Sequence, residues 1–107
     1  MRNFTEAIRI DPLKADFYSN RGFAFRKLGR YEEAIADYSK AIELNPSIPF
    51  FYAGYFKAFY YRALCHEKLG KAEQEERDYL AALDINPTNV NGLYHLGLCY
   101  DRQEKYM

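Results

Sequence analysis

Residues 15–46, with the sequence ADFYSNRGFAFRKLGRYEEAIADYSKAIELNP, decide the fold of this chain. Apolar residues recur at intervals of three and four on both sides of Gly29, which is the pattern of two amphipathic helices. A glycine just past one helix and a proline, Pro46, just past the next are typical stop signals. The stretch therefore predicts a helix, a tight turn and an antiparallel second helix. Because neither helix can bury its apolar face alone, we expect further units to stack on this one.

The closing segment of this stretch recurs along the chain. The hexapeptides AIRIDP, AIELNP and ALDINP end at Pro12, Pro46 and Pro87, at intervals of 34 and 41 residues. Such a period is the signature of a solenoid, and one unit carries seven additional residues. We therefore predict an all-α solenoid of stacked antiparallel helix hairpins, forming a single array over residues 1–107. Its predicted units are the second helix of a preceding repeat at 2–12, complete repeats at 15–46 and 47–87, and the first helix of a following repeat at 90–107.

Composition and charge exclude several classes of protein. The 107 residues carry 15 Lys and Arg against 15 Asp and Glu, and neither half is basic, so a nucleic acid is not an expected partner. Hydrophobic residues make up 49% of the chain, which argues against disorder, and no stretch has the length of a membrane span. Two cysteines are too few for a disulfide scaffold, and the chain opens without a charged and then apolar leader. We therefore expect a cytoplasmic protein that does not contact a membrane.

The repeat resembles the tetratricopeptide repeat family, whose pattern combines aromatic residues, a small residue, alanines and a final proline at fixed offsets. The matching residues are Tyr18, Gly22, Phe25, Ala34, Tyr38, Ala41 and Pro46, and Leu93, Leu96, Gly97 and Tyr100 repeat the first half of the pattern. The resemblance implies a right-handed superhelix that binds other proteins in a concave groove. Pentatricopeptide repeats have a similar length and bind RNA, but the neutral charge and the placement of small residues and proline favour the protein-binding family.

The middle unit carries its seven additional residues between Pro46 and Phe59. Seven residues are close to two turns of about 3.6 residues each, so a helical insertion would keep the apolar face in register. We predict one long helix from about residue 48 to 69, with Tyr52, Tyr55 and Phe56 on its packed side. In the alternative, residues 47–55 form an irregular loop.

Eight of the twelve residues from Phe50 to Tyr61 are aromatic, and one helix face cannot hold them all. They either fill the core between repeats or form a surface for a partner or a second copy of the chain. The end helices offer a further route to self-association, because each lacks its partner helix. The predicted open stripes are Phe4, Ala7 and Ile8 at one end and Leu93, Leu96, Gly97 and Tyr100 at the other.

Catalysis and metal binding find little support in this sequence. Cys65, His66, His95 and Cys99 are the only set of nucleophiles and bases to consider, and His95 and Cys99 are four residues apart on one predicted helix. Equivalent positions on stacked helices lie about 8 to 10 Å apart, which is too far for a disulfide and unfavourable for shared coordination. We therefore predict buried thiols, no metal, no cofactor and no enzyme activity. One further departure is Glu75, which replaces the alanine that faces Ala63, so we expect it to turn to water or reach Arg62 or His66.

The resemblance assigns the groove lining to the first helix of each unit. By repeat equivalence the predicted peptide-binding residues are Asn20, Phe23, Lys27, Lys57, Tyr60, Tyr61, Leu64, Tyr94, His95 and Leu98, together with Ser19, Arg26 and Asn91. We predict a module that binds a hydrophobic or aromatic-containing segment of another protein, with a self-assembling scaffold as a structural alternative. A second alternative is the branch of the family that clamps the C-terminal carboxylates of heat-shock chaperones. Asn20 and Lys57 match that clamp, but Tyr61 stands in place of its arginine.

Overall fold

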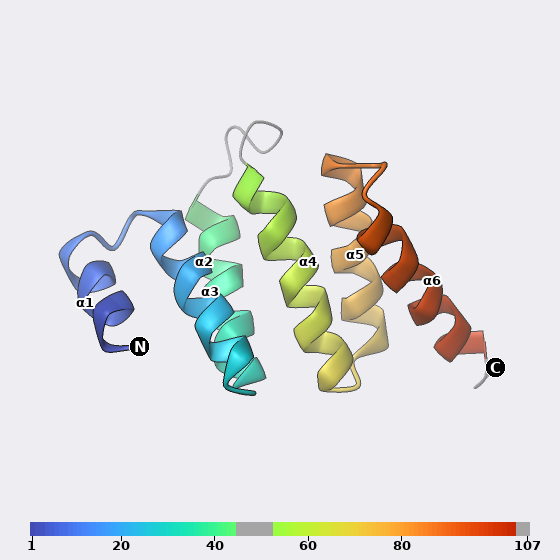
Figure 1. Cartoon of the computed structure of the whole chain (residues 1–107), viewed down its shortest axis with the longest axis horizontal. Helices are drawn as coiled ribbons and strands as arrows, with labels where there is room; N and C mark the ends of the chain where they lie inside the picture. Colours follow the sequence, from blue (N-terminus) through green and yellow to red (C-terminus); the bar gives the residue numbers. More distant parts are fainter. Residues whose placement is uncertain (45–52, 105–107) are drawn as a thin grey trace.

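The computed structural model describes residues 1–44 and 53–104, and within these ranges every regular element is an α-helix. In chain order the helices are α1 (Arg2–Ile10), α2 (Ala15–Lys27), α3 (Tyr31–Leu44), α4 (Ala53–Lys68), α5 (Ala72–Ile85) and α6 (Val90–Glu104). Figure 1 shows them in one row, with α2, α4 and α6 nearer to the viewer than α3 and α5. The prediction of an all-α solenoid is confirmed. None of the described helices is long and apolar enough to cross a membrane.

Two tight turns reverse the chain between α2 and α3 and between α4 and α5. Gly29 and Gly70 have φ angles of 75° and 73°, in the left-handed region that glycine adopts without the steric cost of a side chain. In the first turn the N–H of Arg30 donates to the carbonyl oxygen of Phe25 at 2.9 Å, and the equivalent bond of the second turn has the same length. These bonds satisfy carbonyl groups that a helix end leaves open. They hold each helix pair antiparallel.

The core is distributed among the contacts between neighbouring helices, as expected for a solenoid. Three separate clusters form it: Ala15, Tyr18 and Ala41; Ala34, Tyr38, Ala58 and Cys65; and Ala63, Tyr79, Leu96 and Cys99. Each cluster contains a tyrosine and at least one alanine, and small residues let the helices approach closely around the ring. Burial raises the pKa of Cys65 to about 11, so its thiol stays protonated and packs as an apolar group.

The first helix of the middle unit, α4, has 16 residues and exceeds α2 by three. Residues 53–55, which the loop alternative placed in irregular structure, are helical. The predicted start near residue 48 and Tyr52 lie outside the described residues. Tyr55 is only 3% exposed, and its hydroxyl donates to the carbonyl oxygen of Ile42 at 3.1 Å. The additional turn therefore packs against α3.

Glu75 does not turn to water, and it does not pair with Arg62 or His66, so that expectation is wrong. The side chain is 2% exposed and forms an ion pair with Arg102 of α6. This partner lies in the following helix of the row, and Arg102 also lies 3.5 Å from the carboxylate of Glu67. The hydrogen bond from Arg102 to Glu75 raises the pKa of the arginine further. The negative charge of Glu75 is therefore balanced by Arg102, across the contact between α5 and α6.

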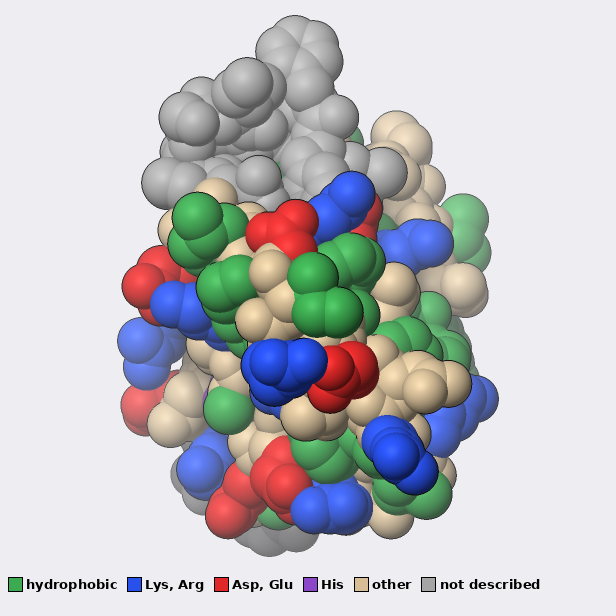
Figure 2. Space-filling view, turned by 90° about the vertical axis from the view of Figure 1, so that its left-hand side faces the viewer, with side chains coloured by type: hydrophobic (Ala, Val, Ile, Leu, Met, Phe, Trp, Pro, Cys, Tyr) green, Lys and Arg blue, Asp and Glu red, His purple; other side chains and the backbone are tan. Residues whose placement is uncertain are grey.

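The two ends of the row differ in how much apolar surface they leave open. Helix α1 has no buried residue, and Figure 2, which faces this end, shows hydrophobic side chains among Lys, Arg, Asp and Glu. At the other end Leu93 and Tyr100 are 50% and 40% exposed. Leu96, however, is buried against Ala63 and belongs to the core rather than to the open stripe predicted for it. The side chain of Leu96 thus joins a cluster that contains residues of α4 and α5.

Candidate functional site

A continuous row of aromatic rings crosses α2, α4 and α6, the three helices nearer to the viewer in Figure 1. We call it the aromatic strip, and it consists of Phe23, Tyr61, Tyr60, His95 and Tyr94. Successive ring centroids lie 5.4, 5.3, 5.8 and 5.6 Å apart, and all four contacts are edge-to-face. Such contacts are favoured by the ring quadrupole, so the rings hold one another in place. The strip therefore offers a preorganised apolar surface.

Cations border the strip at its α2 end. The guanidinium carbon of Arg26 lies 4.8 Å from the ring centroid of Tyr61 and 5.2 Å from that of Phe23. The ammonium group of Lys27 lies 5.3 Å from the same Phe23 centroid. These are cation–π distances. The α2 end of the strip is consequently both aromatic and positively charged.

A pocket of about 270 Å³ opens beside these rings, between α2 and α4. We call it the groove pocket, and it is lined by Ser19, Asn20, Phe23, Tyr38, Lys57 and Tyr61. The sequence reasoning assigned five of these residues to the groove but placed Tyr38 in the core. Its ring is 1% exposed and packs in the core, while it also forms part of the pocket wall. No sequence pattern distinguishes this tyrosine from Tyr79, which occupies the same position of the next unit.

Buried polar atoms around the groove pocket lack partners within the described part of the chain. They are the hydroxyl groups of Ser19 and Tyr38 and the Nε of Arg26. Burial raises the pKa of Tyr38 strongly, so its hydroxyl keeps a proton that it can donate. A buried polar group without a hydrogen bond is costly, at about 1 to 3 kcal/mol. A ligand that offers hydrogen-bond acceptors here would recover part of that cost.

Most of the predicted groove residues lie in the groove pocket or in the aromatic strip. The structure places Asn20, Phe23, Lys57 and Tyr61 in one pocket and continues the strip through the predicted Tyr60, His95 and Tyr94. Leu64 is half-buried and, like Tyr60, packs against the cluster of Ala63 and Tyr79. Leu98 lines a separate hollow with Asp101, Arg102 and Glu104.

The histidines and cysteines do not converge on a catalytic or metal site in the described ranges. The thiol of Cys99 is buried and lies 3.9 Å from the carbonyl oxygen of Ala72, while the ring of His95 stacks on Tyr79 at 6.0 Å. Burial raises the pKa of Cys99, which makes its thiol a poor nucleophile. Residues 1–44 and 53–104 contain no group of three or more His, Cys, Asp or Glu side chains that could hold a metal ion.

Two arginine–aspartate pairs, which the sequence reasoning missed, occupy equivalent places in the two hairpins. Arg21 binds Asp37 through Nε and Nη2 at 2.7 and 2.8 Å, and Arg62 binds Asp78 through the same atoms at 2.7 Å each. The third nitrogen of Arg62 donates to Ser39 at 2.9 Å. Two signals in the sequence point to these pairs: Arg21 departs from the more common leucine, and both the arginine and the aspartate recur 41 residues later, as Arg62 and Asp78.

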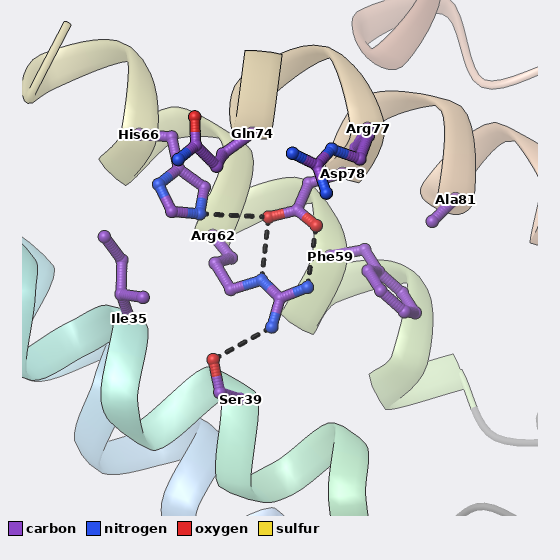
Figure 3. A pocket seen from close by; sticks show the side chains of 9 residues that line it. All are labelled: Ile35, Ser39, Phe59, Arg62, His66, Gln74, Arg77, Asp78 and Ala81. Carbon is purple, nitrogen blue, oxygen red and sulfur yellow. Dashed lines mark hydrogen bonds and ion pairs between the residues drawn. The ribbon is translucent and has the colours of Figure 1, made fainter. Parts of the chain in front are cut away.

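The second pair lines another pocket (Figure 3). The α4 residues of this pocket, Phe59, Arg62 and His66, lie on the opposite side of the helix from Lys57 and Tyr61 of the groove pocket. We call this cavity of about 460 Å³ the outer pocket. It is lined by Ile35, Ser39, Phe59, Arg62, His66, Gln74, Arg77, Asp78 and Ala81, which come from α3, α4 and α5. Helix α4 thus separates two pockets of different composition.

Comparison with proteins of known sequence relates this chain to repeat proteins. Models of the tetratricopeptide repeat match residues 15–48, 56–89 and 78–107. A protein SGT1 homolog from Oryza sativa subsp. japonica is 51% identical over 45 residues, which are 42% of this chain and 12% of the relative. The mitochondrial import receptor subunit TOM70 of Homo sapiens is 39% identical over 69 residues, which are 60% of this chain and 10% of that protein. The chain therefore spans about a tenth of the length of these curated relatives.

Solved structures show the same arrangement of helices. The first repeat domain of Spaghetti (RPAP3), bound to the HSP90 peptide SRMEEVD, superposes with a TM-score of 0.85 at 26% identity, over 94% of this chain and 75% of that one. The second such domain of human RPAP3, in complex with the HSP70 peptide SGPTIEEVD, gives a TM-score of 0.79 at 31% identity, over 91% and 75%. Its three repeat matches and these neighbours show that the chain belongs to the tetratricopeptide repeat family, whose members are protein-interaction modules.

Proposed function

We propose that this chain binds an extended or helical segment of a partner protein along the aromatic strip, without catalysing a reaction. The observation that carries the proposal is the adjacency of the strip to the groove pocket, since both share Phe23 and Tyr61. Preformed aromatic surfaces bind apolar side chains at a low entropic cost. The ligand we propose presents hydrophobic or aromatic residues to the strip.

The groove pocket adds a polar element to this recognition. Its amide and ammonium groups, from Asn20 and Lys57, lie at its mouth as exposed side chains, and the hydroxyls of Ser19 and Tyr38 are buried without partners. All four groups can donate hydrogen bonds. A carbonyl or carboxylate group of the ligand is therefore the group that we place here.

A second candidate function is the binding of chaperone tails. Two observations favour it: Asn20 and Lys57 line the same pocket, and the two RPAP3 domains are described with HSP90 and HSP70 peptides that end in EEVD. Tyr61 stands where the family's clamp has an arginine. In this candidate the terminal carboxylate enters the groove pocket, and the nearby guanidinium of Arg26 supplies positive charge beside Tyr61.

Fluorescence anisotropy with two labelled peptides tests both candidates. One peptide is SRMEEVD, with its C-terminal amide as a matched control, and the other carries aromatic residues and an amidated end. If the strip binds the ligand, Tyr60→Ala and Tyr61→Ala each lower the affinity for the aromatic peptide by about 30-fold, which corresponds to about 2 kcal/mol of binding free energy. Tyr100→Ala, an exposed aromatic residue outside the strip, is the control and should leave the affinity unchanged.

The opposite pattern would support the chaperone candidate. In that case amidation of SRMEEVD and Lys57→Ala abolish binding, while the two tyrosine variants bind as the parent does. If none of these peptides binds, and no variant changes the affinity of a partner isolated with the parent protein, the groove proposal is wrong.

A further inference from the structure

The charges beside the aromatic strip change sign from α2 to α6. Two adjacent positions near the C-terminal end of each of these helices are charged, and they recur at intervals of 41 and 34 residues. The pairs are Arg26 and Lys27 in α2, Glu67 and Lys68 in α4, and Asp101 and Arg102 in α6. Helix α2 thus presents two cations at these positions, whereas α4 and α6 each present one charge of either sign.

The cations at the α2 end of the strip have no carboxylate partner. Arg26 and Lys27 lie against the strip through their contacts with the rings of Phe23 and Tyr61. Lys57 joins them, because it lines the groove pocket together with the same two rings. None of these three cations forms an ion pair with a residue in the ranges 1–44 and 53–104. This end of the strip is therefore positively charged.

The α6 end of the strip has the opposite charge. The guanidinium group of Arg102 is neutralised by the buried Glu75 and also lies 3.5 Å from the carboxylate of Glu67. Asp101 and Glu104 are exposed, and neither forms an ion pair within the part of the chain that the structure describes. Free carboxylates thus remain at this end.

These carboxylates lie on the same side of α6 as the strip. Leu98 follows Tyr94 by four residues, and Asp101 follows Leu98 by three, which is the spacing of neighbours on one helix face. Leu98, Asp101 and Glu104 line one hollow of about 450 Å³. A ligand that crosses the strip to α6 therefore reaches an apolar side chain bordered by negative charge.

The distance between the two ends defines the length of the ligand. Figure 1 shows α2, α4 and α6 in sequence along the row. Neighbouring packed helices lie about 8 to 10 Å apart, so two such steps separate the ends by about 16 to 20 Å. An extended chain advances about 3.3 Å per residue. A central stretch of about five to six residues therefore spans the strip.

We propose that the strip binds its partner segment in one orientation, which the charges at its two ends select; this inference rests on the proposed function of the strip. The bound segment carries Asp or Glu at the end that lies over α2 and Lys or Arg at the end that lies over α6. Its central stretch of hydrophobic or aromatic residues contacts Tyr60 and Tyr61. The reversed orientation places like charges together at both ends, which lowers the affinity.

Fluorescence anisotropy with two capped peptides of identical composition tests the charge order. Glu-Glu-Ala-Phe-Ala-Phe-Ala-Lys-Lys separates its charges, whereas Lys-Glu-Ala-Phe-Ala-Phe-Ala-Glu-Lys has one charge of each sign at either end. We expect the charge-separated peptide to bind about tenfold more tightly at about 0.05 M salt. The difference should vanish at about 1 M salt, because exposed charges are then screened within about 3 Å.

Charge-reversal variants locate the two ends on the protein. Lys27→Glu and Asp101→Lys should each weaken binding of the charge-separated peptide about fivefold and leave the mixed peptide unaffected. The matched control variants are Lys40→Glu on α3 and Asp84→Lys on α5, which make the same charge changes outside the strip. They should leave both affinities unchanged.

A nitroxide label on either end of the charge-separated peptide reports its orientation by NMR. The label on the acidic end should broaden the backbone amide resonances of α2, and the label on the basic end should broaden those of α6. A fourfold variant reverses both ends of the strip and should exchange the two patterns. It combines substitutions of exposed residues, which keep the fold: Lys27→Glu, Lys57→Glu, Asp101→Lys and Glu104→Lys.

The outcomes separate this inference from the proposed function. Equal affinities of the two peptides, or equal broadening of α2 and α6 by both labels, would overturn the selected orientation and leave binding by the strip intact. If neither peptide binds at either salt concentration, the proposed function fails, and the inference fails with it.

Discussion

The carboxylate of Asp78 is held by Arg62 from the neighbouring helix, with Nε and Nη2 each 2.7 Å from a carboxylate oxygen. The aspartate side chain is 7% exposed and that of the arginine 20%, and the pair of Arg21 with Asp37 has nearly the same values. Each hairpin therefore contains a two-point ion pair between its two helices. Helix α6, which corresponds to α2 and α4 in the repeat, has Leu96 at the position equivalent to Arg21 and Arg62.

This pair predicts a large asymmetry between single and double variants. Arg62→Leu leaves the buried carboxylate of Asp78 without its cation, and we expect a loss of about 3 to 5 kcal/mol in the free energy of unfolding. The double variant Arg62→Leu with Asp78→Ala removes both charges and should recover most of that loss. Urea denaturation of the parent, both single variants and the double variant measures the coupling. Additive effects of the two substitutions would contradict the prediction.

The contact between α5 and α6 predicts a second asymmetry, at Glu75 and Arg102. Their side chains are 2% and 40% exposed, so removal of the arginine strands a buried charge, whereas removal of the glutamate leaves a cation that water can reach. We expect Arg102→Ala to cost several kcal/mol and Glu75→Ala clearly less. Ala34 occupies the place equivalent to Glu75 in the first hairpin, which shows that alanine fits there. If urea denaturation gives the same loss of unfolding free energy for both variants, the ion pair does not determine the stability of this contact.

Gly22 and Gly97 occupy equivalent positions of the repeat, but Gly22 is closely packed and Gly97 faces open space. We therefore expect the two alanine substitutions to change stability differently. A Cβ on Gly22 would lie 3.2 Å from a ring carbon of Tyr38 and 3.3 Å from the carbonyl oxygen of Ala34, whereas one on Gly97 would meet nothing within 4 Å. Gly97→Ala should therefore raise stability by about 0.5 to 1 kcal/mol through helix propensity. Gly22→Ala should not raise the free energy of unfolding, which should be at least about 1 kcal/mol lower for this variant than for Gly97→Ala. A thermal unfolding series of the two variants and the parent decides the order.

His66 predicts a pH dependence of stability in the unliganded chain. Burial lowers its pKa, against the attraction of Asp78, so the unfolded chain takes up this proton at a higher pH than the folded chain does. Stability should consequently fall as the pH drops below about 6.5, and this loss should be absent from His66→Phe. The comparison is the difference in unfolding free energy between the two proteins at about pH 7.5 and about pH 5.5. A difference that does not change with pH would show that His66 is not the group involved.

The open face of α6 predicts self-association at high concentration. Leu93 and Tyr100 are half exposed beside Gly97, and α1 of another copy presents Phe4 at 36% exposure. Light scattering should show a mass that rises with concentration, and Tyr100→Glu should restore the monomer mass. Leu96→Glu is unsuitable for this test, because Leu96 is buried in the cluster of Ala63 and Tyr79 and its replacement would destabilise the chain. A constant monomer mass for the parent would rule the contact out.

The sequence by itself determined the helices, their turns and the repeat. Helical periodicity, a glycine after one helix and a proline after the next are local signals, and each depends only on residues within a few turns. The same local register placed Tyr60 and Tyr94 in one strip, because they occupy equivalent positions of stacked units.

Only the tertiary structure decided which side chains meet between units. Glu75 found its partner in α6, Leu96 turned into the core, and the hydroxyl of Tyr38 was left unpaired beside the groove pocket. These outcomes depend on the rotation between stacked hairpins, to which many weak contacts contribute and which no local pattern encodes. His66 and Arg77 are eleven residues apart in the sequence and lie on different helices, so only the packing of α4 against α5 brings them into one pocket.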